Sequence, residues 1–197
     1  ILTQIAEHRE NPRDDLTSYL LNVEIEGTPV DDEIAAGMIV LLLVAGIDTT
    51  WSAIGSSLWH LAQHPEDHQR LLDDPDVMTF ALEEFLRSYA PVTMARMAAK
   101  DTDFHVCPMK KDDWVVPPFP AANRDPHKFE DADTLIVDRQ ENRHAAFGLG
   151  IHRCIGSNLA RLELRVAIEE FTKRFPRYEL AGDTRWSVGQ IRGPREL

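Results

Sequence analysis

A helical pattern of apolar residues dominates the first third of the chain. It begins after Pro29, where Asp31 and the acidic residues that follow can cap a first turn, and it continues to His64, where Pro65 stops it. A helix of about thirty residues, at about 1.5 Å per residue, is roughly 50 Å long and can cross a whole domain. The centre of this helix, residues 38–45, is apolar on all sides, so we expect it to be buried in a core.

The rest of the chain is expected to be mostly helical, with little β structure. The patterns predict helices over 65–72, 76–89 and 154–174, short strands between 94 and 116, and strand and turn from 178 to 197. Three prolines (117, 118 and 120) should break regular structure, residues 123–126 should form a turn, and 139–150 a long irregular loop. The sequence therefore predicts a mainly α fold with minor β structure, in one domain over residues 1–197.

The composition excludes several classes of protein. The chain has 197 residues, 33 acidic and 21 basic, with a formal net charge of −12, and 43% of its residues are hydrophobic. This is ordinary for a folded domain, and the acidic balance argues against nucleic acid or an anionic membrane as the main partner. The longest uncharged apolar stretch, residues 34–47, is shorter than the roughly 20 residues of a membrane span. Two cysteines cannot build a disulfide framework, and no targeting segment is recognised, so a cytoplasmic location is expected.

The most specific sequence is the glycine-rich loop FGLGIHRCIG at residues 147–156. It presents the Cys154 sulfur just before a predicted helix, whose free N–H groups and dipole favour a thiolate. The glycines let the backbone approach a large flat group, and an axial thiolate favours O–O cleavage at a haem iron. Two alternatives stay open: Cys154 as a buried small hydrophobe, or as a nucleophile beside His152. Zinc is disfavoured as the ion bound by Cys154, because no second Cys or His pair with suitable spacing accompanies this cysteine.

A second unusual sequence, AGIDTT at residues 45–50, lies in the middle of the long helix. Thr49 lies one turn after Ala45, so its hydroxyl can bond back to that carbonyl and loosen the helix. Gly46 leaves space on that face for a small ligand, and Asp48 is a costly ionisable group unless it serves a function. The alternative is a helix break, with Asp48 or Thr49 capping a second helix that begins near Trp51.

The third sequence is a Glu-x-x-Arg pair. Glu84 and Arg87 are three residues apart in a predicted helix, so their side chains share a face and can pair. Alone, the pair is weak evidence for a function, because most such pairs are exposed and contribute about 0–1 kcal/mol to stability.

Together these sequences resemble the cytochrome P-450 family of haem-thiolate monooxygenases, of the soluble bacterial type. The resemblance covers essentially the whole chain but only the second half of the family's sequence, so it implies the C-terminal half of the P-450 fold. Four motifs stand in the family's order: the helix groove (Ala45, Gly46, Asp48, Thr49), the Glu-x-x-Arg pair (Glu84, Arg87), an Asn-Arg-Asp turn (residues 123–125) and the cysteine loop (Phe147, Gly148, Gly150, His152, Cys154, Gly156).

The resemblance implies a haem b cofactor, with Cys154 as the proximal iron ligand and the other loop residues shaping the backbone around it. Arg96 and His152 stand where the family binds the haem propionates, although Arg96 can also be read as a solvated strand charge. Arg139 matches the position that joins the Glu-x-x-Arg pair in a buried charge network, and Arg143 competes for that position.

The resemblance also implies a reaction. Asp48 and Thr49 would deliver protons for O₂ cleavage, which favours O₂-dependent monooxygenation over the peroxide-driven branch. Electrons would come from a separate ferredoxin or flavoprotein, and Arg153 and Arg161 are candidates for meeting an acidic carrier. The expected substrate is a hydrophobic organic molecule facing residues 42–49, 91–95 and the stretch near Ile191, although each of these is equally well explained by core packing.

The ends of the chain suggest a fragment. Ile1 lies inside an amphipathic pattern without a preceding Met, and the chain stops just after Gly193 and Pro194. The family's first half is absent, so the long helix should be partly uncovered and expose apolar surface. We expect this chain to pair with the missing half, to self-associate, or to come from a cleaved longer protein. The alternative function is a non-catalytic haem-binding or interaction fragment, inactive by itself.

Overall fold

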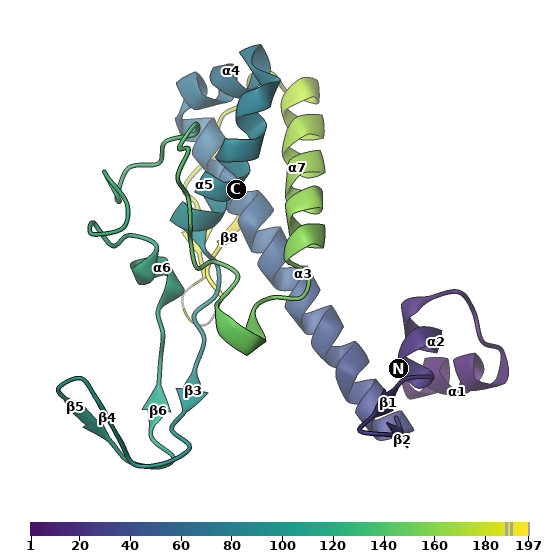
Figure 1. The fold of residues 1–197 in the computed structure, drawn as a ribbon. Coiled ribbons are helices and arrows are strands. Elements are labelled where there is room, and N and C mark those ends of the chain that lie inside the picture. Colours follow the sequence, from purple (N-terminus) through teal and green to yellow (C-terminus); the bar gives the residue numbers. More distant parts are fainter. Residues whose placement is uncertain (188, 190, 197) are drawn as a thin grey trace. The chain divides into compact units, whose positions relative to one another are not determined.

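The computed structural model describes residues 1–187, 189 and 191–196 (Figure 1). The chain divides into two compact units, Ile1–Asp48 and Thr49–Leu197. The helix α3 (Asp32–Gln63) runs through the boundary between them. Helices outnumber the short two-stranded ribbons in the described residues, which confirms the predicted mainly α fold with minor β structure.

The first unit is a small helical cap on the start of α3. It contains α1 (Leu2–Glu10), α2 (Leu16–Leu21) and an antiparallel ribbon of β1 (Glu24–Ile25) and β2 (Thr28–Pro29). Its core consists of four buried side chains: Ile5, Leu21, Val30 and Ala35. Arg9 holds the unit together, because its guanidinium donates to the carbonyls of Leu21 and Val30 at 2.7 and 2.9 Å.

The second unit contains the larger core. Its helices are the end of α3, α4 (Pro65–Asp73), α5 (Met78–Tyr89) and α7 (Ser157–Arg174), with the 3₁₀ turn η1 (Pro75–Val77) before α5. Buried apolar residues from these four helices form one cluster, which includes Leu61, Leu71, Phe85, Leu164 and Ile168. The packing of α5 and α7 places the Glu-x-x-Arg pair and the cysteine loop in the same unit.

Three antiparallel ribbons and two short helical segments complete this unit. The ribbons are β3 (Arg96–Met97) with β6 (Trp114–Val115), β4 (Thr102–Phe104) with β5 (Cys107–Met109), and β7 (Arg185–Trp186) with β8 (Pro194–Glu196). The short helical segments are α6 (Phe119–Ala122) and η2 (Gly150–His152). Two predictions here were wrong: α6 forms among the three prolines, because Pro is tolerated in a first helical turn, and α7 begins at Ser157 rather than at Cys154.

Helix α3 has the predicted ends. The Asp31 carboxylate accepts a hydrogen bond from the N–H of Ile34 at 2.8 Å, and Pro65 follows the last turn. The helix is continuous, so the alternative of a break before Trp51 was wrong. By length and apolar composition it is also the one described helix that could cross a membrane, a test that the core helix of a large domain passes equally.

The expectation that residues 38–45 would be buried was wrong for this chain. Leu41 and Val44 are 67% and 62% exposed, and their neighbours along α3 are also open. A helix that is apolar on all sides needs covering elements on every side, and the described residues cover only part of it. The prediction that this helix would expose apolar surface is therefore confirmed.

The C-terminal ribbon packs directly on α3. A Cβ atom at Gly193 would lie 2.6 Å from the Cβ of Ser52, so only glycine fits there. Just before it, Ile191 forms an isolated antiparallel bridge with Val92. The structure thus brings together two of the stretches that the sequence analysis placed near a substrate.

Candidate functional site

The loop before α7 presents the Cys154 sulfur at the surface. The N–H of Cys154 donates to the carbonyl of Phe147 at 2.9 Å, which folds the loop back on itself. Gly148 and Gly150 have φ angles of 69° and 74°, in the left-handed region that strongly favours glycine. The loop conformation therefore depends on its glycines and leaves the thiol exposed.

This exposure bears on the alternatives for Cys154. The interpretation of Cys154 as a buried small hydrophobic residue is wrong, because the residue is exposed. No hydrogen bond joins its sulfur to His152 in the part of the chain that the structure describes, so nothing there supports an activated nucleophile. The adjacent Ile151 and Ile155 are 97% and 92% exposed. An exposed sulfur flanked by exposed apolar side chains suits a large apolar ligand.

Glu84 lies at the centre of a buried charge network. The carboxylate of Glu84 accepts two hydrogen bonds from the Arg87 guanidinium, both at 2.8 Å, and both side chains are 0% exposed. It accepts further hydrogen bonds from Arg139 Nε at 3.1 and 3.2 Å, from the Ile136 N–H at 2.8 Å and from Asn142 at 2.9 Å. Burial raises the pKa of Glu84, but the hydrogen bonds from Arg87 and Ile136 outweigh it and hold the pKa below its usual range.

Arg139 thus occupies the third position beside Glu84 and Arg87. Its guanidinium also donates to the carbonyl of Glu130 at 2.7 Å, so the segment before the irregular loop is connected to the network as well. The competing candidate, Arg143, is exposed.

Asn123 connects this network to the cysteine loop. Its carbonyl accepts from Arg87 at 2.8 Å, and its side-chain amide donates to the Arg87 carbonyl at 3.2 Å. The Asn123 side-chain oxygen accepts from the N–H of Ala145 at 2.7 Å, two residues before Phe147. Because Asn123 is buried, it fixes the start of the loop relative to α5.

A second cluster, which the sequence analysis missed, braces the other side of the loop. The Glu83 carboxylate accepts from Arg161 at 2.5 and 2.8 Å and from His144 Nε2 at 3.0 Å. The guanidinium carbon of Arg161 lies 4.6 Å from the centroid of the Phe147 ring. Arg161 is therefore engaged within the fold and is not a free surface charge. No local sequence signal indicated this cluster, because Glu83 and Arg161 are 78 residues apart.

The charges in this cluster support one another. Burial raises the pKa of Glu83, but hydrogen bonds from Arg161 and His144 prevail and lower it to about 2. The hydrogen bonds to Glu83 hold the pKa of Arg161 above its ordinary value, with a smaller contribution from the charge of Cys154. The Nδ1 of His144 accepts from the Ala146 N–H at 3.2 Å, which leaves Nε2 to donate to Glu83.

Arg96 lies on β3, and its guanidinium donates to the carbonyl of Ala95 at 2.8 Å. Within the described ranges, no carboxylate lies at ion-pair distance from Arg96 or His152. Both therefore remain open to an anionic group.

The other predicted residues lie on α3. Ala45 and Gly46 are exposed, and Asp48 and Thr49 are half-buried and interact with other residues. Nothing lies within 4 Å of the place where a Cβ of Gly46 would be, in a stretch of α3 that is exposed.

The chain belongs to the cytochrome P-450 family. The family model described as Cytochrome P-450 matches residues 2–78 and 67–183. Among curated proteins, the chain is 37% identical over 179 residues to a probable cytochrome P-450 127A1 of Sinorhizobium fredii, covering 91% of this chain and 43% of that protein. It is 38% identical over 187 residues to the polyketide biosynthesis cytochrome P-450 PksS of Bacillus subtilis, covering 92% and 46%.

Solved structures show the same fold. The structure of Bacillus subtilis PksS superposes with a TM-score of 0.92 at 38% identity, over 98% of this chain and 51% of that one. A complex of P-450 BioI with an acyl carrier protein ligated to hexadec-9Z-enoic acid gives 0.91 at 35% identity, over 98% and 50%. The prediction of half a P-450 fold is confirmed, and the chain spans about half the length of the curated relatives that it matches.

The family implies a haem cofactor, and the residues present fit one. The exposed thiol of Cys154 supplies a soft anionic ligand, and the positive-φ glycines keep side-chain bulk out of the loop. Arg96 and His152 are polar groups without a carboxylate partner among the described residues, as propionate binding requires.

Proposed function

We propose that this chain is the C-terminal portion of a single cytochrome P-450 domain, and that the whole protein is an O₂-dependent haem-thiolate monooxygenase. The observation that carries the proposal is the exposed Cys154 thiol. It lies on a glycine loop that the carbonyl of Phe147 closes with a hydrogen bond. Two charge clusters on α5, one buried around Glu84 and one half-buried around Glu83, hold this loop. A ligand held in this way keeps its position whether or not the metal is bound, which is the preorganisation that a haem ligand needs.

The haem would be held by three groups of this chain, and it supplies the redox chemistry that amino acid side chains lack. Cys154 would be the iron ligand, while Arg96 and His152 would bind the propionates. Gly148, Gly150 and Gly156 would allow the loop backbone to approach the ring closely.

Asp48 and Thr49 would handle protons. They are adjacent half-buried residues on α3, one able to exchange a proton with solvent and the other carrying a hydroxyl that can pass it on. Ala45 and Gly46, one turn before them, are the smallest side chains on this part of the helix. The pair would deliver protons to O₂ beside a hydrophobic substrate, so that one oxygen atom enters the substrate and the other leaves as water.

The proposed partners follow from the cytochrome P-450 family and from the charge of the chain. Electrons would come from a separate ferredoxin or flavoprotein. The net charge of −12 disfavours nucleic acid and anionic membranes, which supports a cytoplasmic protein. The substrate would be a hydrophobic small molecule, and a fatty acyl group on a carrier protein, as in the BioI complex, is one class that fits this description.

One observation favours a second candidate function. The exposed apolar side chains of α3, among them Leu41 and Val44, leave this chain with an uncovered surface. A chain of half the family length can therefore act as a haem-binding or interaction fragment that is inactive until it pairs with the missing half or with itself.

The first experiment is an absorption spectrum of the reduced, CO-bound, haem-reconstituted protein. Thiolate ligation predicts a red-shifted Soret band that Cys154→Ser abolishes and Cys107→Ser leaves unchanged, since Cys107 is the other exposed cysteine. A red-shifted band that survives in Cys154→Ser contradicts the proposal. Turnover is then measured with a redox partner for the full-length protein and for this chain. Turnover by the full-length protein supports the monooxygenase, and its absence in this chain alone supports the inactive fragment.

A further inference from the structure

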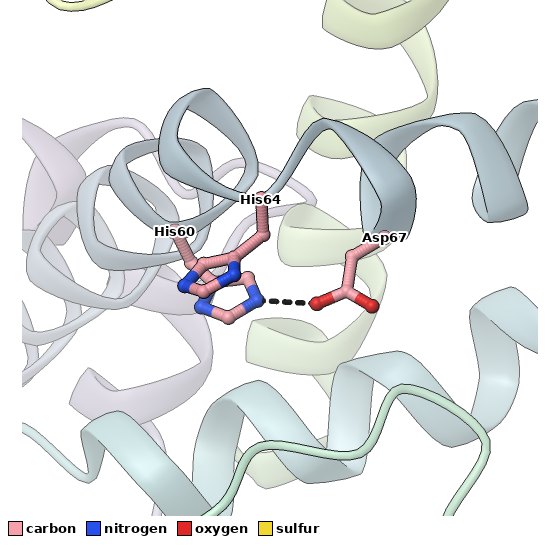
Figure 2. A group of neighbouring side chains, drawn as sticks. All are labelled: His60, His64 and Asp67. Atoms are coloured by element: carbon pink, nitrogen blue, oxygen red, sulfur yellow. Dashed lines mark hydrogen bonds and ion pairs between the residues drawn. The ribbon is translucent and has the colours of Figure 1, made fainter.

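Three metal-ligating side chains meet where α3 ends and α4 begins, in elements that the haem proposal does not use. His60 lies in the last turn of α3, His64 precedes α4, and Asp67 lies in the first turn of α4. One nitrogen from each imidazole and one Asp67 oxygen lie within 4.8 Å of one another. Figure 2 shows the two stacked rings beside the Asp67 carboxylate.

The local sequence produces this arrangement. His60 and His64 are four residues apart, so their rings lie one above the other, with centroids 4.2 Å apart. Pro65 ends α3 and starts α4, and the reversal brings Asp67 back to His60. The Nε2 of His60 and the Oδ2 of Asp67 are 2.7 Å apart.

His60 is held in place for a ligand role. Its ring is buried and packs edge-on against Phe85, with centroids 5.7 Å apart. The Nδ1 of His60 lies 2.9 Å from the Tyr89 hydroxyl, so a partner on the far side of the ring fixes its orientation. Metal-binding histidines usually have such a partner on the second ring nitrogen.

The other two groups can adjust to an ion. His64 is exposed, so its ring can turn without disturbing the core. The exposed Glu66 carboxylate lies 3.2 Å from the Nδ1 of His64 and supplies a further oxygen donor. Asp67 is half-buried and needs to move little, because its oxygen already contacts His60.

The surrounding space and charge suit a cation. These residues line a hollow of about 410 Å³, which also includes Asp133 and Arg124. Arg124 is the one guanidinium in the described lining, and it already donates to Asp133 at 3.3 Å. The carboxylates of Glu66, Asp67 and Asp133 therefore leave the hollow negatively charged overall.

We propose that His60, His64 and Asp67 bind a divalent transition metal ion, for which Zn²⁺ is the best match. Two imidazoles and one carboxylate are a typical zinc set, with a fourth position left for water or Glu66. Zinc ligands lie about 3.3 Å apart when each is about 2.0 Å from a tetrahedral ion, so His64 closes inward while His60 and Asp67 separate slightly. With the ion on Nε2 of His60, its Nδ1–H donates to Tyr89.

A zinc titration monitored by isothermal titration calorimetry tests the proposal. We expect the unsubstituted chain, called the parent below, to bind one equivalent of zinc. In His64→Ala the affinity for this zinc should fall at least about tenfold, or binding should disappear. Even the loss of a hydrogen-bond partner of a metal ligand reduces metal affinity about 10–100-fold. His64 is exposed, so this variant keeps the fold, which the melting temperature without zinc verifies. His127→Ala is the matched control, because His127 is an exposed histidine outside this cluster, with its Nδ1 3.0 Å from an Asp125 carboxylate oxygen.

Zinc taken up by Cys107 and Cys154 is common to the parent and both variants, so the comparison isolates the histidine site. A second readout is the melting temperature, which zinc should raise in the parent and in His127→Ala but not in His64→Ala. The proposal is overturned if the parent shows no such phase, or if His64→Ala binds zinc as tightly as His127→Ala.

Discussion

Glu83 and Glu84 are consecutive residues of α5, yet their carboxylates belong to two different charge clusters. Glu84 binds Arg87 within its own helix and Arg139 from the irregular loop, whereas Glu83 binds Arg161 of α7. Adjacent residues of a helix point about 100° apart, so one turn of α5 can hold two segments at once. The two segments lie on either side of the cysteine loop in the sequence. Both carboxylates therefore hold segments that flank the loop with Cys154.

Removing Arg87 should strongly destabilise the protein. Arg87→Ala leaves the Glu84 carboxylate buried with fewer compensating charges, and breaking a buried pair in this way costs about 3–5 kcal/mol. Urea unfolding monitored by circular dichroism measures the change. Arg143→Ala, which removes an exposed arginine, should change stability by less than about 0.5 kcal/mol. Equal effects of the two substitutions would show that the network does not stabilise the fold.

Glu83 should make stability sensitive to acid. Its pKa is about 2 in the folded protein, against an ordinary value of 4.5, so the unfolded chain takes up a proton first as the pH falls. The stabilisation from Glu83 is therefore complete above about pH 4.5 and declines toward pH 2. Comparing urea midpoints at pH 5.5 and 3.5 measures this loss. It should be smaller in Glu83→Gln than in the parent.

The exposed residue Glu141 supplies the control for this experiment. Glu141→Gln should lose as much stability between the two pH values as the parent does. If Glu83→Gln and Glu141→Gln behave alike, another carboxylate accounts for the acid sensitivity.

The local motifs were predictable because each depends on residues close in the sequence. The cap at Asp31, the stop at Pro65 and the glycine loop before α7 follow from backbone rules that a single sequence displays. The pair of Glu84 and Arg87 was predictable for the same reason, since three residues separate them on one helix.

The remaining features depend on contacts between distant segments. Glu83 and Arg161 are 78 residues apart, and no local pattern distinguishes this pair from ordinary surface charges. The burial of residues 38–45 was predicted wrongly. An apolar composition shows that burying a helix would be favourable, but it does not show that another element covers the helix. The close approach of Gly193 to Ser52 is likewise visible only in the fold.

Gly193 should be intolerant of even one added methyl group. A Cβ there would lie 2.6 Å from the Ser52 Cβ and 3.0 Å from its Cα, which is helix backbone and cannot move aside easily. Overpacking of this kind costs about 1–3 kcal/mol, so Gly193→Ala should lower the free energy of unfolding by that amount. Gly182→Ala is the control, because nothing lies within 4 Å of its Cβ position. A stability of Gly193→Ala equal to that of Gly182→Ala would mean that the C-terminal ribbon does not pack on α3.

Asn123 should control the order of the cysteine loop. In Asn123→Ala, the part-buried Ala145 N–H loses its acceptor and the buried Arg87 carbonyl loses a donor. Leaving buried groups unpaired costs about 1–3 kcal/mol each, so part of the loop should detach from α5 and open locally. Hydrogen exchange followed by mass spectrometry should show faster exchange over residues 145–154, with less change in the core of α7.

The matched control is Asn158→Ala, which removes an exposed amide from α7, four residues after Cys154. Exchange in the loop should stay at the parent rate in this variant, and the red-shifted band of the reduced CO complex should keep its full intensity. In Asn123→Ala that band should weaken, because a loop that opens holds the thiolate less firmly. If Asn123→Ala exchanges faster in the loop but keeps the full band, the order of the loop does not control haem ligation. The clusters around Glu83 and Glu84 would then stabilise the fold without positioning the sulfur.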